Sequence, residues 1–197
     1  MQCLVAVPTF ESIQPATFKS IYELEAPKGW KLHFEYITGH DVTVARNKIA
    51  RLAENFNRLF SVDSDIVLPK DTLKKLNKMP FDVCTGVYPK KRSTEGHSNV
   101  WAIGGKDFVD ENNIKVRDMD NYNEPFEIKG CGMGCALINS TVFSRVPFPW
   151  FQYTTYNTGD TLSEDLNFCL KAGICGITFG VDPTIRCGHI MTSIQYD

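Results

Sequence analysis

The chain has 197 residues, of which 43% are hydrophobic and 22% charged, the composition of an ordinary globular protein able to bury one core. Its 21 Lys and Arg residues against 23 Asp and Glu residues give a net charge of -2 at pH 7, so no overall positive field favours nucleic acid binding. The first apolar run, Cys3 to Val7, is too short for a signal peptide or a membrane span. We therefore expect a cytoplasmic protein.

Strands and helices are predicted to alternate in the first half of the chain. Apolar runs indicate strands at residues 3–8, 32–37, 59–62, 66–68 and 81–87, and helical spacing of apolar residues indicates helices at 15–24 and 42–57. Asp41 is a suitable N-cap for the second helix, and Asp71 caps a short one that ends at Leu76. This alternation is typical of a doubly wound α/β fold, in which ligands bind at the carboxyl ends of the strands.

The second half contains shorter strand candidates separated by segments rich in turn residues. They lie at residues 101–103, 126–128, 135–138 and 177–181, which predicts a smaller and more antiparallel portion. A helix over 163–172 begins with Ser163 and carries Glu164 and Asp165 in its first turn. No repeat or linker divides the chain, so one domain over residues 1–197 is expected.

The seven cysteines are an odd number, which argues against a disulfide framework. Most of them lie in apolar stretches, where a reduced thiol packs as a small hydrophobic group. A zinc site formed by the later cysteines with His189 is the alternative, but no CxxC pair supports it. Buried free thiols are therefore expected.

Asp63 and Asp65 interrupt an apolar run that continues on both sides, in the sequence RLFSVDSDIVLP. Two carboxylates at the end of a buried strand repel each other and lose hydration, which is costly unless a positive charge lies nearby. A divalent Mg2+ or Mn2+ ion would relieve both costs, because such ions prefer oxygen ligands and can bridge to phosphate. A solvated turn after a strand is the simpler alternative.

Other phosphate-binding motifs are missing from the sequence. The segment at Gly105 lacks the glycine that a P-loop requires at position 100, and Gly130, Gly132 and Gly134 do not have the dinucleotide-binding spacing. Alternate glycines instead indicate tight turns or a close approach of the backbone to a ligand. A cation held by carboxylates is thus the expected means of neutralising a diphosphate.

Several motifs follow one another along the chain: VAVPTF, ARNKIARLA, LFSVDSDIVLP, KGCGMGCALI, SEDLNFC and a closing GH. In that order they resemble the motifs of GT-A glycosyltransferases, in the broad neighbourhood of family 2, including small viral and bacterial members. The resemblance spans essentially the whole chain. It implies a single GT-A (Rossmann-like) α/β domain, with a mixed sheet flanked by helices, and a Mn2+ or Mg2+ cofactor.

The resemblance also implies roles for individual residues. Asp65 would ligate the metal directly, Asp63 would contact the metal or the ribose, and His189 would be the third protein ligand. A UDP- or GDP-linked sugar donor would be bound mainly by residues 1–95, and a carbohydrate or other hydroxyl acceptor by residues 96–197. The donor-binding set would comprise Pro8, Thr9, Arg46, Asp63, Ser64 and Gly132.

By the same resemblance, Asp165 would be the general base of an inverting transfer, with Glu164 as an acceptor ligand or structural residue. The helix dipole stabilises carboxylates in a first turn in any case, so a purely structural role is the alternative. Arg46 and Asn47, near the start of their helix, would suit a diphosphate or nucleobase, since arginine forks onto phosphate oxygens.

Three further features are left open by the sequence. Trp150 and Tyr153 would stack on a sugar or pack in the core, whereas core packing is favoured for Phe151. Residues 90–92, Lys-Lys-Arg, are a solvated charge run or contacts for an anionic acceptor. A lone histidine such as His189 is more often a packed or surface residue than a ligand, and only the resemblance favours the metal.

The predicted function is metal-dependent transfer of a sugar from a nucleotide-sugar donor to an acceptor hydroxyl. The alternatives are a nucleotidyltransferase and a non-catalytic sugar- or nucleotide-binding module of the same fold. Because 197 residues are few for this fold, a partner chain, such as the second copy in a homodimer, could complete the acceptor site.

Overall fold

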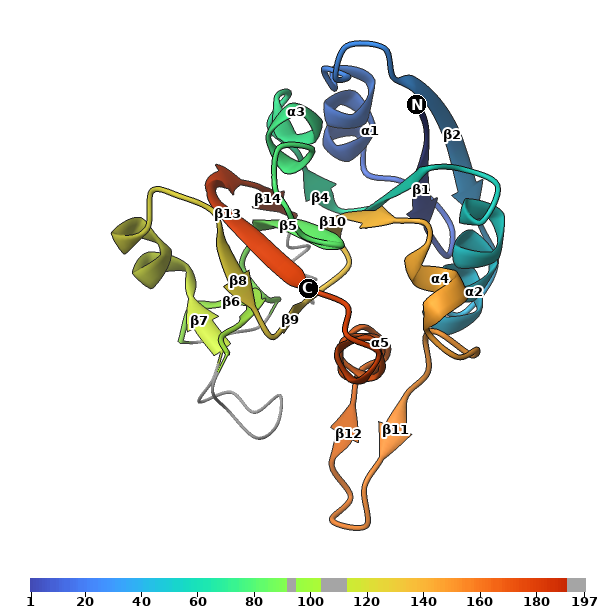
Figure 1. Ribbon diagram of the computed structural model, residues 1–197, viewed down its shortest axis with the longest axis vertical. Coiled ribbons are helices and arrows are strands. Elements are labelled where there is room, and N and C mark those ends of the chain that lie inside the picture. Colours follow the sequence, from blue (N-terminus) through green and yellow to red (C-terminus); the bar gives the residue numbers. More distant parts are fainter. Residues whose placement is uncertain (92–94, 104–112, 191–197) are drawn as a thin grey trace, which may run out of the picture.

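A computed structural model describes residues 1–91, 95–103 and 113–190 of the protein. Its central strands are β1 (Gln2–Pro8), β2 (Lys31–Ile37), β3 (Arg58–Val62), β5 (Val83–Val87), β8 (Phe126–Ile128), β10 (Cys135–Asn139) and β13 (Phe179–Arg186). They form one seven-stranded sheet in the order β2-β1-β3-β10-β5-β13-β8 (Figure 1). The sheet is mixed, because β1 is parallel to β2 and β3, and β5 to β13, whereas β10 is antiparallel to both its neighbours.

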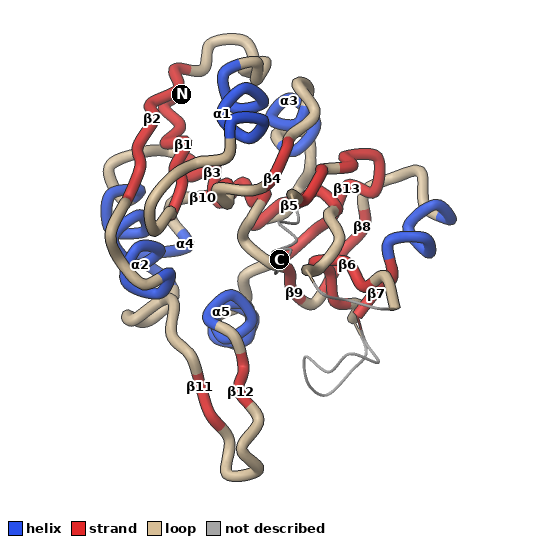
Figure 2. The backbone as a smooth tube through the Cα atoms, turned by 180° about the vertical axis from the view of Figure 1, so that it is seen from behind, coloured by secondary structure: helices blue, strands red, loops and turns tan. Residues whose placement is uncertain are grey.

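Helices cover both faces of this sheet (Figures 1 and 2). They are α1 (Pro15–Tyr22), α2 (Val42–Ala53), α3 (Thr72–Leu76), α4 (Val142–Arg145) and α5 (Glu164–Ile174). In β1, Leu4 and Ala6 pack in a core cluster with side chains of α2, α4 and α5, while Cys3, Val5 and Val7 pack in a second cluster with side chains of α1 and α3. Successive strand residues face opposite sides, so a strand covered on both faces has to be continuously apolar.

The alternation of strands and helices predicted for the first half is confirmed. In the second half, β10 and β13 lie within the central sheet, beside β3 and β5, and β10 and β8 pair antiparallel to their neighbours there. A second, antiparallel sheet consists of β7 (Asn113–Lys115), β6 (His97–Trp101) and β9 (Gly130–Cys131). The strand predicted at 101–103 is wrong in position, because the observed strand β6 ends at Trp101.

Two boundaries differ from the predictions for identifiable reasons. α2 ends at Ala53, before the predicted 57, because Asn57 already pairs with Gln2 through its backbone N–H and its Oδ1 and leads into β3. β13 continues past the predicted end at 181, although Pro183 lies within it. The pairing of β13 with β5 shifts register between Val181 and Arg186, and such an irregularity accommodates a residue without a backbone N–H.

Several short elements were not predicted. Besides β7 and β9, they are the 3-10 helix η2 (Val116–Asn121), the helix α4, and the strands β11 (Thr154–Thr155), β12 (Thr161–Leu162) and β14 (Gly188–His189), the last of which pairs with β4 (Ile66–Val67). β11 and β12 form a hairpin that extends away from the body near α5 (Figures 1 and 2). Within the described residues, no helix is long and apolar enough to cross a membrane.

Gly180 tests the packing of the central sheet. A Cβ atom at this position of β13 would lie 2.0 Å from the Phe81 ring, so Gly180→Ala should destabilise the fold by about 1–3 kcal/mol through overpacking. Gly173 in α5 is the matched control, because its Cβ would meet nothing within 4 Å and alanine favours a helix by roughly 0.5–1 kcal/mol. Thermal unfolding of both variants checks this, and a Gly180→Ala protein as stable as wild type would contradict the packing.

Candidate active site

The loop between β3 and β4 carries the sequence Asp63-Ser64-Asp65, and its three side chains have different surroundings. Asp63 Oδ1 accepts a hydrogen bond from Arg46 Nη2 at 2.9 Å. Ser64 lines a pocket. Asp65 Oδ1 lies 3.4 Å from His189 Nε2. One short loop at the carboxyl end of β3 therefore joins a buried ion-pair cluster, a cavity and a carboxylate–imidazole pair.

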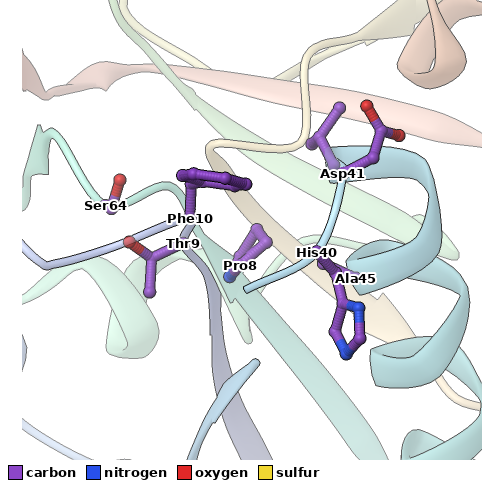
Figure 3. A pocket seen from close by; sticks show the side chains of 8 residues that line it. Pro8, Thr9, Phe10, His40, Asp41, Ala45 and Ser64 are labelled. Carbon is purple, nitrogen blue, oxygen red and sulfur yellow. The ribbon is translucent and has the colours of Figure 1, made fainter. Parts of the chain in front are cut away.

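The pocket has a volume of about 420 Å³ and lies where β1 ends and α2 begins (Figure 3). Pro8, Thr9 and Ser64, three residues of the predicted donor-binding set, line it. Arg46, Asp63 and Gly132, from the same set, are not among its lining residues. The sequence did not single out its other walls, formed by Phe10, His40, Asp41, Val42 and Ala45. Phe10 is 69% exposed, so its ring is accessible to a ligand.

Asp65 and His189 are brought together by the pairing of β14 with β4. His189 pairs with Ile66, and the Ile190 N–H donates to the Asp65 carbonyl at 2.9 Å. His189 Nδ1 lies 2.6 Å from the Pro89 carbonyl oxygen. A carbonyl only accepts, so Nδ1 carries a proton and Nε2 is the nitrogen that faces Asp65.

The charges of this pair are set by each other and by Lys91, which donates to Asp65 Oδ2. Burial by itself would raise the pKa of Asp65, but the hydrogen bonds from His189 and Lys91 outweigh it and hold that pKa below its ordinary value. Burial by itself would lower the pKa of His189, but the contacts with Asp65 and the Pro89 carbonyl raise it. The carboxylate is therefore ionised, and the Lys91 ammonium is paired with it.

The donor atoms at this position fit a divalent cation. Asp65 offers carboxylate oxygens, and His189 offers an imidazole nitrogen whose partner nitrogen is fixed by a carbonyl, as in many metal sites. The Lys91 ammonium lies on Asp65 where such a cation would be held. In the described part of the chain, no cluster of three or more His, Cys, Asp or Glu side chains could hold a metal ion, and Asp63 is bound to Arg46 instead. The three-ligand set of Asp63, Asp65 and His189 remains a prediction.

Arg46 is the centre of a buried cluster of charges. Its side chain is 4% exposed, and besides Asp63 its Nε lies 3.0 Å from Asp165 Oδ1 and 3.3 Å from Glu164 Oε1. Burial by itself would lower the pKa of the guanidinium, but the carboxylates of Asp165, Asp63 and Glu164 raise it. One cation thus faces three acidic side chains, two of them from the first turn of α5.

Asp165 has the protonation behaviour of a base that works near neutral pH. Burial raises its pKa to about 7, against the opposing effect of Arg46, and the Glu164 and Asp63 charges raise it further. Its Oδ2 accepts from the Met133 N–H at 3.0 Å. Its Oδ1 is buried and forms an ion pair with Arg46 Nε at 3.0 Å, but it accepts no hydrogen bond among the described residues.

The glycine-rich segment lies against Tyr88, a residue that sequence reasoning did not identify. The Gly134 N–H donates to the Tyr88 hydroxyl at 2.9 Å, and a Cβ at Gly134 would come within 2.9 Å of Asp63 Oδ2. A Cβ at Gly132 would lie 2.5 Å from the same hydroxyl. Gly132 and Gly134 therefore leave room for Tyr88 and Asp63, and the approach of this backbone to a ligand remains a prediction. The only signal in the sequence is the position of Tyr88 directly after a strand, at the edge where ligands bind.

Other sequence-based assignments are settled by packing. Asn47 donates to the Thr43 and Phe151 carbonyls and accepts from the backbone N–H groups of Trp150 and Phe151, so its amide is not available to a diphosphate. Trp150 is 2% exposed and belongs to the core with Phe151, whereas Tyr153 is half exposed. Lys91 contacts Asp65, Lys90 lies over the Trp101 ring, and Arg92 is outside the described residues.

Six of the seven cysteines are buried and Cys175 is partly buried. Burial raises the pKa of the Cys3 thiol to about 12 and that of Cys84 to about 11. These thiols are protonated at neutral pH and pack as apolar groups, as the sequence predicted.

The chain has a GT-A-like fold: a single α/β domain with a mixed seven-stranded sheet flanked by helices. It resembles the A197 protein from STIV with a TM-score of 0.64 and 17% identity, over 98% of this chain and 87% of that chain. It resembles GalNAc-T7, solved with UDP, GalNAc and Mn2+, with a TM-score of 0.61 and 13% identity, over 97% of this chain and 44% of that chain. For S. aureus TarS 1-349 the TM-score is 0.53 and the identity 15%, over 92% of this chain and 58% of that chain.

The chain thus spans less than two thirds of the GalNAc-T7 and TarS chains. No protein-family model and no curated protein matches its sequence. At these identities the structural likeness shows the fold alone.

The raised pKa of Asp165 makes stability depend on pH. In the unfolded chain this carboxyl loses its proton near its ordinary pKa of 3.8, but in the folded protein it keeps the proton up to about pH 7. Between these values the folded state binds more protons, so stability falls as pH rises. Thermal unfolding across this range should show wild type losing stability relative to Asp165→Asn. A stability difference between wild type and Asp165→Asn that does not change with pH would mean that Asp165 is ionised throughout this pH range.

Proposed function

We propose that the protein transfers a sugar from a UDP- or GDP-linked donor to an acceptor hydroxyl, with Mn2+ or Mg2+ bound by Asp65 and His189. The observation that carries the proposal is the loop at residues 63–65, around which the cavity, the Asp65–His189 pair and the Arg46–Asp165 cluster meet. Four carboxylates lie here, on Asp63, Asp65, Glu164 and Asp165, against the cations of Arg46 and Lys91 and the imidazole of His189. A divalent ion is the natural complement of such an excess of negative charge.

In this proposal the nucleoside occupies the cavity beside β1. Its walls are the turn after β1 and the start of α2, and the Phe10 ring offers an apolar face to a nucleobase. Ser64 would direct the ribose and diphosphate toward Asp65, and the metal held there would stabilise the negative charge of the departing nucleoside diphosphate. The GT-A-like fold agrees with this arrangement, since GalNAc-T7 was solved with UDP, GalNAc and Mn2+.

Asp165 is the proposed base. The acceptor hydroxyl would donate its proton to the carboxylate of Asp165, whose side chain is 16% exposed. The acceptor oxygen would then form a bond to the anomeric carbon of the sugar, while the bond from that carbon to the diphosphate oxygen breaks. The Met133 N–H donates to Oδ2 of Asp165 and so holds the carboxylate in place.

Replacing Asp165 by asparagine keeps the size of the side chain but removes the base. With saturating donor and acceptor, Asp165→Asn should transfer sugar at least about 100-fold more slowly than wild type while binding donor and Mn2+ equally well. Glu164→Gln should be milder. Release of UDP or GDP from a panel of nucleotide sugars with Mn2+ measures this.

The same panel of nucleotide sugars can also contradict the role of Asp165 as the base and the proposed reaction itself. Near-wild-type turnover by Asp165→Asn would show that Asp165 is not the base and would favour a retaining mechanism. Release of pyrophosphate from nucleoside triphosphates would favour a nucleotidyltransferase, and tight binding without any turnover would favour a non-catalytic module.

The metal assignment has its own test in binding. Asp65→Ala and His189→Ala should each weaken Mn2+-dependent binding of UDP or GDP at least about tenfold, because one of few metal ligands is lost. Asp118→Ala, on the exposed helix η2, is the control and should bind like wild type. Calorimetry with and without Mn2+ measures the effect, and equal, metal-independent affinity in all four proteins would refute the site.

A further inference from the structure

We propose that Arg46 positions the base Asp165 and does not bind the donor diphosphate, although its place at the start of α2 suggests a phosphate ligand. The inference rests on the proposed transfer reaction. It assigns Arg46 a role through another residue: it holds the Asp165 carboxylate in place and links it to the Asp63-Ser64-Asp65 loop.

Each nitrogen of the Arg46 guanidinium already has a partner within the protein. Nη2 donates to Asp63 at 2.9 Å and Nη1 lies 3.5 Å from the Ser61 hydroxyl. Nε lies between Glu164 and Asp165, at 3.3 and 3.0 Å. Only 4% of the Arg46 side chain is exposed. A diphosphate would therefore have to displace a carboxylate and open the cluster before it reached the guanidinium.

The backbone that carries Arg46 is held firmly. The side chain of the neighbouring Asn47 makes three hydrogen bonds that join α2 to the backbone of Trp150 and Phe151, and a fourth to the Thr43 carbonyl within α2. On the other side, Asp165 is held by the Met133 N–H and by its place in the first turn of α5. Because both backbones are fixed, a change at Arg46 acts on Asp165 by removing the guanidinium charge and its contact with Oδ1.

The groups around Asp165 explain why it needs this cation. Glu164 and Asp63 act on it with like charge, and Tyr88, Tyr153 and Cys131 are uncharged neighbours. Burial raises the pKa of the two tyrosines, and the hydrogen bond with Cys169, together with burial, raises that of Cys131. Arg46 supplies the opposing positive charge. Without it, desolvation and the two carboxylates would keep Asp165 protonated at neutral pH, and a protonated carboxyl cannot accept the acceptor's proton.

Arg46→Gln, Arg46→Lys and the control Arg51→Lys separate the possible roles. Arg51 lies on the same helix and is exposed, so its variant should behave like wild type. Arg46→Gln should lower kcat at least about 30-fold. It should also move the rising limb of the plot of kcat against pH up by about one pH unit or more. Its affinity for UDP or GDP with Mn2+ should change less than about threefold. Arg46→Lys keeps the charge, so the rising limb of its pH profile should stay near that of wild type. Its kcat should fall less than that of Arg46→Gln.

Two other results would overturn the proposal. A loss of nucleotide affinity of about tenfold or more with an unmoved pH limb would make Arg46 a donor ligand. A lower thermal stability with unchanged kcat and pH limb would make its role purely structural. If wild type transfers no sugar from any donor, the proposed function fails irrespective of Arg46.

A second measurement uses unaltered protein and needs neither turnover nor a stable variant. The Arg46 Nε–H signal in nitrogen-15 NMR should be protected from solvent exchange, and should keep its position when UDP or GDP is added with Mg2+. A large shift of that signal on adding nucleotide, together with a change of the phosphorus-31 signals that Arg46→Lys abolishes, would show a direct contact with the diphosphate and refute the proposal.

Discussion

The Arg46 guanidinium lies within 2.9–3.3 Å of three carboxylates while its side chain is almost completely buried. Its partners come from the end of β3 and the start of α5, 17 and 118 residues away in the chain. Taking a charge out of water is costly unless it is paired, and removing one partner of a buried pair leaves the other uncompensated. The end of β3, the start of α5 and helix α2, which carries Arg46, are therefore constrained to lie together. The Asp63-Ser64-Asp65 loop and the glycine segment are positioned around this cluster.

The same constraint divides the two aspartates of the Asp63-Ser64-Asp65 loop. Asp63 is committed to the buried cluster, while Asp65 faces His189 and Lys91 at the edge of the sheet. The site thus has a buried interior, in which Arg46 faces three carboxylates, and an outer carboxylate–imidazole pair. In the proposed function the base Asp165 is linked to this loop through Arg46 and Asp63, and the metal is bound at Asp65.

Much of this arrangement was predictable from patterns. Continuous apolar runs located β1, β3 and β5, because strands covered on both faces cannot alternate, and Asp41 and Ser163 marked the starts of α2 and α5. The position of Asp63, Ser64 and Asp65 after β3 followed from the same reasoning. The short strands β11, β12 and β14 were missed because two residues carry no periodic signal, and their pairing depends on the tertiary fold.

The side-chain partners in the site were less predictable than their positions. Arg46 at the start of a helix suggested phosphate, since nothing local reveals that residues 164 and 165 will lie beside it. Asn47 looked equally suited to a ligand, yet its amide is used to hold residues 150 and 151. Tyr88 carried no motif at all, although its hydroxyl contacts the glycine segment. Long-range contacts of this kind arise from strand order, and β10 lying between β3 and β5 was not expected.

The most direct test of the account is diffraction from crystals of the protein soaked with Mn2+ and UDP or GDP, recorded so that the anomalous signal locates manganese. The account predicts one strong peak in contact with Asp65 and His189, with the nucleoside in the cavity lined by Pro8, Thr9 and Ser64 and with Arg46 still on its carboxylates. A bound nucleotide with manganese elsewhere, or with Arg46 turned onto its diphosphate, would contradict it.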